Sequence, residues 1–141
     1  MLKAKDMMSK NVVSLKRKTP LLEALKILVE NNITGLPVIK DDASQSLAGI
    51  VSEKDFLSLL YGTHNWERET VDSIMTANPA CIDEDATARE VCDCFRSNVF
   101  RRIPVVSKEK LVGIITTRDI VSFMSKRLER VGNLESFIGQ P

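Results

Sequence analysis

The chain has 141 residues, a size that suits one compact domain or two small ones sharing a core. Hydrophobic residues make up 43% and charged residues 28%, a globular composition that argues against disorder along the whole length. The 20 basic and 19 acidic side chains leave a net charge of +1, which lacks the basic bias of a protein held to nucleic acid through phosphates.

The first half of the chain predicts a strand, a helix, two strands and a second helix. Thr19 is a good N-cap and Pro20 fits the first helical position, after which apolar residues recur at helical spacing as far as Val29. Ser52, followed by Asp55, begins the second helix. The strands are short apolar runs at 12–15, 36–39 and 47–51.

The second half predicts the same order of elements. Thr87 and Glu90 form a capping box at the start of its first helix, whose apolar face includes Cys94 and Val99. Thr116 begins the second helix. The strands are expected at 80–82, 103–106 and 111–115.

A polar linker and a C-terminal tail complete the chain. The linker holds His64, the single histidine, which we expect to be exposed to solvent. The tail is charged and then apolar, and we expect it to dock on the body of the protein or on a partner subunit. The predicted boundaries are 7–62 for the first repeat, 63–73 for the linker, 74–126 for the second repeat and 127–141 for the tail.

The two halves are copies of one another. Met8 and Met75 are 67 residues apart, and the same offset relates turn residues and the ends of apolar runs in the first part of each copy. Farther along, the offset falls to 64 because one loop is shorter. Further pairs are Asn11 and Asn78, Glu23 and Glu90, Pro37 and Pro104, Gly49 and Gly113, and Asp55 and Asp119.

One copy alone has too little apolar surface for comfortable stability. The two copies should therefore pack their sheets or helices together. We predict an α/β fold in which two β-α-β-β-α repeats pack about a pseudo-two-fold axis.

The sequence gives little indication of an enzyme, a metal-binding protein or a membrane protein. Cys92 and Cys94 lack zinc spacing, and with Cys81 they make an odd number of cysteines in one half, which is no disulfide framework. No nucleophile elbow or P-loop is present, so we expect no enzyme. No stretch approaches the roughly 18 apolar residues of a membrane span, and residues 1–6 are too polar for a signal peptide. We expect a cytoplasmic protein.

A recurring motif resembles a known family. Residues 49–55 (GIVSEKD) and 113–119 (GIITTRD) share a glycine, two apolar residues, a hydroxyl residue and an aspartate three positions further on. Residues 36–38 (LPV) and 103–105 (IPV) precede them. This ordered set, present twice, resembles the cystathionine-β-synthase (CBS) domain, of which a tandem pair is called a Bateman module. The resemblance implies an α/β pair that often dimerises into a flat disc.

The resemblance also implies a ligand. Members of this family bind AMP, ADP, ATP or S-adenosylmethionine in two clefts between the copies. By that likeness, Asp55 and Asp119 would accept hydrogen bonds from ribose hydroxyls, while Ser52 and Thr116 would contact ribose or phosphate. The other candidates are Ser14 and Cys81 in the opening strands, Val38, Ile39, Val105 and Val106 beside the adenine, Arg101 and Arg102 at the phosphates, and Arg118.

Physical chemistry is consistent with these roles. A carboxylate only accepts hydrogen bonds, so it suits the two donors of a ribose diol. The start of a helix and an arginine fork both favour phosphate. However, Ser52 with Asp55 and Thr116 with Asp119 are also ordinary capping boxes, and the two interpretations are compatible.

The two copies differ in charge at one position. The second copy has Arg101 and Arg102 where the first has Thr34 and Gly35. We therefore predict unequal sites, of which one prefers a charged nucleotide. The arginines are alternatively ordinary surface charges.

We predict a non-catalytic sensor that needs no cofactor, binds an adenosine-containing ligand and passes its occupancy to an effector protein, with a homodimer as the expected assembly. The alternative is a structural or protein-interaction module with unoccupied clefts. Nucleic-acid binding is the weakest interpretation, because both halves are nearly neutral.

Overall fold

The computed structural model describes residues 1–98 and 100–139 and divides the chain into two compact units. One unit is Val13–Pro79, which we call the first-repeat unit. The other combines Met1–Val12 with Ala80–Pro141, and we call it the second-repeat unit. The chain thus passes from one unit to the other twice, between residues 12 and 13 and between residues 79 and 80.

The first-repeat unit contains a four-stranded sheet in the order β1-β2-β3-β4. Strands β1 and β2 are parallel because a helix connects them, whereas β2 and β3 form an antiparallel hairpin. Its elements are β1 (Leu15–Lys16), α2 (Leu21–Glu30), β2 (Gly35–Ile39), β3 (Leu47–Ser52), α3 (Glu53–Ser58), the 3-10 helices η1 (Leu59–Tyr61) and η2 (Val71–Ser73), and β4 (Thr76–Ala77).

The second-repeat unit contains a three-stranded sheet in the order β5-β6-β7, with the same parallel pair and the same hairpin. Its elements are α1 (Ala4–Met7), β5 (Ile82–Asp83), α4 (Ala88–Ser97), β6 (Arg102–Ser107), β7 (Lys110–Thr116) and α5 (Thr117–Val131). Among the described residues, no helix has both the length and the apolar character that crossing a bilayer requires.

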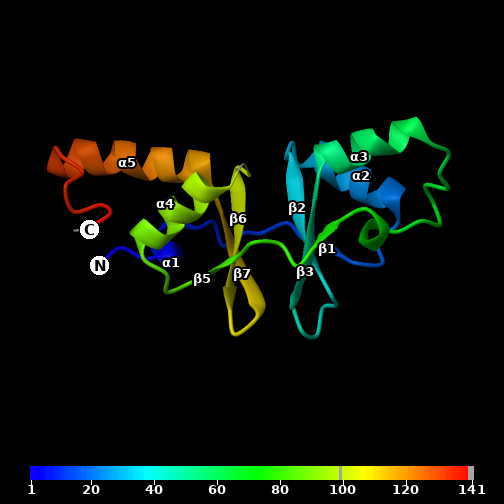
Figure 1. The fold of residues 1–141 in the computed structure, drawn as a ribbon, viewed down its shortest axis with the longest axis horizontal. Helices are drawn as coiled ribbons and strands as arrows, with labels where there is room; N and C mark the ends of the chain where they lie inside the picture. The colour runs from blue at the N-terminus through cyan, green and yellow to red at the C-terminus, as the bar shows by residue number, and fades with distance from the viewer. Residues whose placement is uncertain (99, 140–141) are drawn as a thin grey trace. The chain divides into compact units, whose positions relative to one another are not determined.

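The strand registers of the two units are equivalent. Leu15 lies opposite Val38 in one unit, and Ile82 lies opposite Val105 in the other. In each unit the two longer helices cover the same face of the sheet (Figure 1). The predicted α/β architecture of two repeats is therefore confirmed.

A proline occupies an inner strand of each sheet, β2 or β6, which we call the middle strand. Pro37 lies in β2 and Pro104 in β6, and both are fully buried. A proline has no N–H to give a neighbouring strand, so it is normally confined to sheet edges. Here β1 pairs with β2 only from Val38 onward, so at Pro37 the middle strand has no neighbour on that side. The shortness of β1 and β5 makes both prolines acceptable.

Each unit has its own hydrophobic core between its sheet and helices. In the first-repeat unit the core centres on Leu21, Leu36 and Val51, whose side chains are almost fully buried. In the second-repeat unit Val91 and Ile115 are completely buried. Cys94 is partly buried, whereas Val99, predicted for the same helix face, lies outside the described residues.

The predicted N-cap at Thr19 is wrong. Helix α2 begins one residue later, with Pro20 in the N-cap position and no side-chain cap. The main chain of the linker takes over that role, because Leu21 N–H donates to the Glu69 carbonyl and Leu22 N–H to the Trp66 carbonyl, each at 2.9 Å. A tertiary contact thus satisfies the donors that a local side chain was expected to satisfy.

The linker is a structured part of the first-repeat unit. His64 Nδ1 lies 3.0 Å from Glu69 Oε1, and only 24% of the His64 side chain is exposed, so the prediction of a fully exposed histidine is wrong. This contact holds the pKa of Glu69 below its usual value. Trp66 packs against the core. A segment this polar becomes ordered because its own residues bond to one another and its main-chain carbonyls accept hydrogen bonds from α2.

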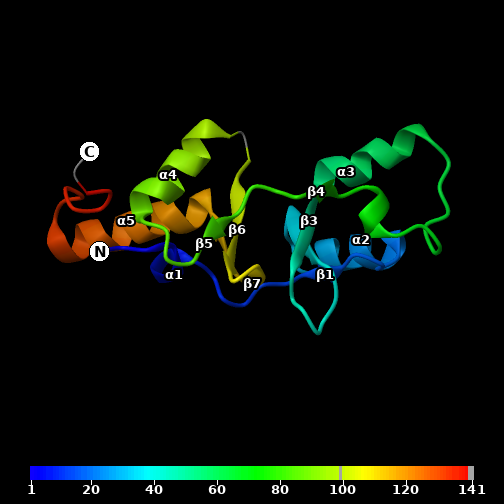
Figure 2. The same ribbon diagram turned by 60° about the horizontal axis from the view of Figure 1, so that its bottom comes forward.

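The opening segment of each repeat belongs to the compact unit of the other repeat. Helix α1 contacts β7 and α5, and Ser9 exchanges two main-chain hydrogen bonds with Ile114. In the first-repeat unit the corresponding segment is β4, which pairs antiparallel with β3 (Figure 2). The repeats defined by sequence and the compact units are therefore different divisions of the chain.

Two glycines accommodate these exchanged segments. A Cβ built on Gly49 would lie 2.6 Å from Met75 Sδ and 2.7 Å from the Thr76 carbonyl oxygen. A Cβ on Gly113 would overlap Met8 Sδ and lie 3.0 Å from the Ser9 carbonyl oxygen. Both positions need glycine because the facing methionine segment approaches the strand so closely. We call each contact a methionine–glycine contact.

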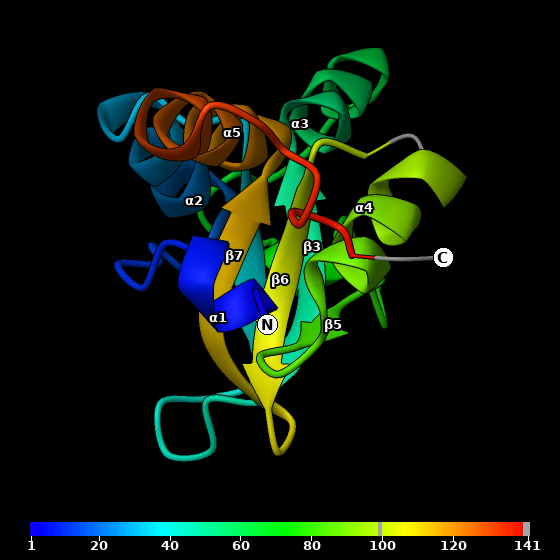
Figure 3. The same ribbon diagram turned by 90° about the vertical axis from the view of Figure 1, so that its left-hand side faces the viewer.

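The C-terminal tail docks on the second-repeat unit. Helix α5 ends at Val131, and Gly132 follows with a φ of 86°, the left-handed conformation that commonly ends a helix. The tail then turns back from α5 toward α4 (Figure 3). Phe137 is 5% exposed and packs edge-on against Phe123, with ring centres 5.9 Å apart.

Candidate functional site

The second helix of the second repeat begins with a complete capping box. The N–H of Thr116 donates to Asp119 Oδ2 at 2.9 Å, and the N–H of Asp119 donates to Thr116 Oγ1 at 3.0 Å. Thr116 is the last residue of β7, so the strand ends and the helix begins at the same residue. The capping interpretation of this motif is confirmed.

The first repeat has the equivalent arrangement at α3. Ser52 N–H donates to Asp55 Oδ2 at 2.8 Å, and Ser52 Oγ donates to the same oxygen at 3.2 Å. Within the described residues, Oδ1 of Asp55 and Oδ1 of Asp119 accept no hydrogen bond. Each aspartate therefore uses one oxygen for the helix cap and keeps a second acceptor for something else.

The starts of these helices offer fewer donors than the sequence suggests. The N–H of Glu53 donates to the Thr34 carbonyl, and the N–H of Thr117 donates to the Arg101 carbonyl, both at 3.0 Å. In α5 the hydroxyl of Thr116 takes a further N–H. The expected cluster of unbonded N–H groups for a phosphate is therefore reduced by contacts within each unit.

These contacts gather several of the candidates of the second repeat. Arg102 and Thr116 are cross-strand partners in the β6–β7 hairpin, and the carbonyl of Arg101 is bonded to α5. Arg101 is exposed and Arg102 partly exposed. Arg118 is exposed in the first turn of α5. Three basic side chains thus lie within a few residues of Asp119 along the chain or across the hairpin.

The first repeat lacks this charge. Gly35 is the cross-strand partner of Ser52, and Thr34 is exposed at the position that corresponds to Arg101. Asp55 therefore lies beside a neutral strand end, whereas Asp119 lies beside a cationic one. The sequence difference between the copies is retained in the folded units.

The candidates in the middle strands lie at an irregularity that both repeats share. The pairing register shifts between Val38 and Ile39, and again between Val105 and Val106. Such bulges redirect the chain and often occur beside functional sites. The side chains of Val38, Ile39 and Val105 are buried, so only the main chain of these residues is available to a ligand. Val106 is partly exposed.

The candidates in the opening strands are small and near the surface. Ser14 is partly exposed and precedes β1. Cys81 precedes β5 and is exposed. Partial desolvation raises the pKa of the Cys81 thiol, which favours the neutral form. Both residues offer uncharged side chains.

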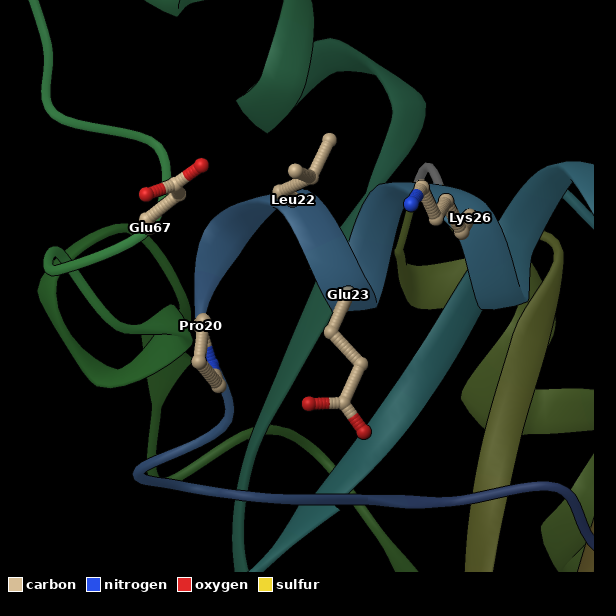
Figure 4. Close-up of a pocket in the computed structure, with 5 residues that line it drawn as sticks. All are labelled: Pro20, Leu22, Glu23, Lys26 and Glu67. Atoms are coloured by element: carbon tan, nitrogen blue, oxygen red, sulfur yellow. The ribbon is translucent and has the colours of Figure 1, made fainter.

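Two surface hollows lie away from these residues. One, of about 260 Å³, lies at the start of α2 and is lined by Pro20, Leu22, Glu23, Lys26 and Glu67. Figure 4 shows that its side chains do not converge, because Leu22 and Glu23 leave the helix on opposite sides. The second, of about 190 Å³, lies on α5 and is lined by Phe123, Lys126, Arg127 and Arg130.

Two copies of one α/β repeat, each with an aspartate-capped helix beside a bulged strand, define a tandem-repeat module. The sequence profile of the CBS domain matches residues 4–62 and 71–126. The chain belongs to the CBS domain family.

Individual relatives cover most of the chain. The protein YlbB of Bacillus subtilis is 30% identical over 140 residues, which are 99% of this chain and 93% of YlbB. Other relatives are longer, since the chain spans only 42%, 23% and 53% of three of them. The match therefore identifies the module and not the larger proteins that carry it.

Solved structures of similar fold include complexes with adenosine-containing ligands. CBSX2 of Arabidopsis thaliana, in complex with AMP, has a TM-score of 0.80 and 30% identity, and the match covers 92% of this chain and all of CBSX2. The CBS domain pair of MJ0100, in complex with 5′-methylthioadenosine and S-adenosyl-L-methionine, has a TM-score of 0.75 and 28% identity, with 90% of this chain and 98% of that one covered. Related CBS pairs thus bind adenosine-containing ligands.

Proposed function

We propose that this chain is a non-catalytic regulatory module that binds an adenosine-containing ligand, with AMP, ADP, ATP and S-adenosylmethionine as the candidates. The observation that carries the proposal is the second carboxylate oxygen of Asp55 and Asp119, which accepts no hydrogen bond within the described residues. A ribose diol supplies the two hydroxyl donors that such an oxygen accepts. The complexes of CBSX2 with AMP and of MJ0100 with 5′-methylthioadenosine and S-adenosyl-L-methionine support the ligand class.

We further propose that the two repeats differ in ligand preference. Arg101 and Arg102 beside Asp119 favour a ligand with phosphate groups, since guanidinium groups bind phosphate oxygens in pairs. Thr34 and Gly35 offer no charge, so the site of the first repeat would be weak, empty or suited to a less anionic ligand. The adenine would contact the main chain at Val38 and Ile39, or at Val105 and Val106, near Ser14 or Cys81.

Asparagine substitutions separate the two roles of the aspartates. In Asp119→Asn one oxygen remains to cap the helix, while the second acceptor becomes an NH₂ donor that cannot accept a ribose hydroxyl. We expect Asp119→Asn to weaken AMP or ATP binding about 10- to 100-fold, the scale of a lost hydrogen bond to a charged group, with little change in stability. Asp55→Asn, the matched variant, should leave that site nearly unchanged. Isothermal titration of both variants with AMP, ATP and S-adenosylmethionine checks this.

The same titration has clear contrary outcomes. If the wild-type chain binds no ligand of the panel, the alternative of an interaction module with unoccupied sites is favoured. Two equal sites with the same salt dependence would contradict the predicted asymmetry. Saturating ligand should also stabilise the chain, by about 2.7 kcal/mol at 100 times its dissociation constant.

We also propose a homodimer, with an effector protein as the further partner that reads ligand occupancy. Exposed apolar side chains on α3, η1 and α5 support this. Leu57 and Tyr61 are 59% and 95% exposed in the first-repeat unit, and Val121 is 62% exposed in the second-repeat unit. Exposed apolar side chains that lie within a few residues of one another along α3 and η1 are typical of an interface.

Sedimentation velocity tests the dimer. The wild-type chain is expected to sediment as a dimer, and Leu57→Glu/Tyr61→Glu as a monomer, because the buried carboxylates would lack partners. Val29→Glu is the matched control, since Val29 is equally apolar and 72% exposed but lies on α2. A monomeric wild type, or a double variant that stays dimeric, would contradict this assembly.

A further inference from the structure

The methionine–glycine contacts have a chemical consequence that is separate from ligand binding. Met75 and Met8 are both partly exposed, and each packs against the core of the unit on which it docks. Each sulfur faces a glycine where not even a methyl group fits. Each thioether therefore fills a tight space within a residue that is itself partly exposed.

We propose that Met8 and Met75 form a paired oxidation site through which a peroxide loosens both opening segments. The thioether sulfur attacks the O–O bond of the peroxide, an S–O bond forms as the O–O bond breaks, and the peroxide is reduced to water while the sulfur loses two electrons. The product is a polar sulfoxide, whose added oxygen does not fit the tight space beside the glycine.

The contacts around Met8 and Met75 explain why oxidation would loosen the opening segments. Next to Met8, Ser9 holds the opening segment to β7 by two main-chain hydrogen bonds, and β4 begins immediately after Met75. A sulfoxide at either position must hydrate or displace its neighbours, and the adjacent short strand pairing is broken with it. Because the chain is duplicated, one oxidant acts on both units in the same way.

The other methionines provide internal comparisons. Met1 is 97% exposed and Met7 only 6% exposed, so they should oxidise first and last. Met124 is partly buried on α5 and packs against the same core as Met8, but neither Gly49 nor Gly113 has it among the nearest atoms. Sulfoxide at Met1 or Met124 should therefore affect the fold much less than sulfoxide at Met8 and Met75.

The test oxidises the full chain with hydrogen peroxide and then treats it with dithiothreitol to restore the cysteines. Tandem mass spectrometry maps the sulfoxide at each methionine. Thermal melting of the ligand-free chain gives its Tm at each stage of oxidation. We expect Tm to fall by roughly 4–8 °C as sulfoxide accumulates at Met8 and Met75, and to recover when methionine sulfoxide reductases A and B are added. The Tm of Met8→Leu/Met75→Leu should stay unchanged after oxidation. The Tm of Met1→Leu/Met124→Leu should fall as far as the Tm of the wild type.

Contrary results are equally specific. The proposal is overturned if both sulfoxides form without a change in Tm, if Met8 and Met75 resist peroxide while Met1 is fully oxidised, or if the reductases remove the sulfoxides without restoring Tm. It is also overturned if Met8→Leu/Met75→Leu loses as much stability as the wild type. The mapping and the reductase step need no variant, so they decide the matter even if the leucine variants fold poorly.

Discussion

Gly49→Ala is expected to destabilise the protein by about 2–3 kcal/mol, the upper range for overpacking a close contact. The added methyl group would lie 2.6 Å from Met75 Sδ and 2.7 Å from the Thr76 carbonyl oxygen. The second neighbour is main chain in β4, so the strand itself must move. Denaturant unfolding measures the loss, and hydrogen exchange at Thr76 and Ala77 should show β4 opening first.

Gly113→Ala distinguishes a clash with a side chain from a clash with the main chain. At Gly113 the main-chain neighbour, the Ser9 carbonyl oxygen, is farther away at 3.0 Å, and the tightest neighbour is the flexible Met8 side chain. Adding Met8→Ala should therefore rescue Gly113→Ala in part, whereas Met75→Ala should rescue Gly49→Ala much less. Gly62→Ala is the milder comparison and should cost less than either, because its Cβ would meet only the His64 ring, 3.2 Å from Nε2. Equal stability of all three single variants would contradict this account.

The pairing of elements within each copy was predictable because its causes are local. Thr87 was predicted to cap α4 and its hydroxyl does accept the N–H of Glu90. Ser52 and Thr116 follow apolar strands directly, and both were predicted to begin a helix. Periodicity, turn residues and capping residues all act within a few positions of the chain, which a single sequence displays.

The exchange of the opening segments was not predictable from those signals. Residues 7–9 and 74–77 match each other in sequence, but nothing in them says on which sheet each will lie. Helix α1 and strand β4 are too short to have a recognisable period, and tertiary contacts decide their conformation. The one available sign was that Gly49 and Gly113 stand inside apolar strands, where glycine often marks a close approach by another chain segment.

In the candidate site too, local features were predictable and tertiary contacts were not. The caps at Asp55 and Asp119 are local and are confirmed. Their proposed role at a ribose depends on which carboxylate oxygen is not used by the cap. Only the hydrogen-bond geometry of the folded chain shows which oxygen that is. The donors at the helix starts were overestimated from sequence, because the carbonyls of Thr34 and Arg101 come from a distant part of the chain.

Phe137→Ala is expected to be the most damaging substitution in the C-terminal part of the chain. Phe137 is 5% exposed, joins the core of the second-repeat unit and packs against Phe123. Loss of a buried phenylalanine typically costs about 3–5 kcal/mol. Hydrogen bonds from Arg127 to Ser136 at 2.7 Å and from Arg89 to the Gly139 carbonyl at 3.1 Å also hold the tail.

The tail sets an upper limit on that loss, because it is the end of the chain and can detach instead of leaving a cavity. Phe137→Ala should therefore cost no more than deletion of everything after Gly132, and the two losses should be close if the aromatic ring supplies most of the docking energy. Ile138→Ala, at a side chain 42% exposed, is the neighbouring control and should cost far less. If deletion of the tail leaves the unfolding midpoint unchanged, the tail adds nothing to the core, and the burial of Phe137 follows from the fold without contributing to its stability.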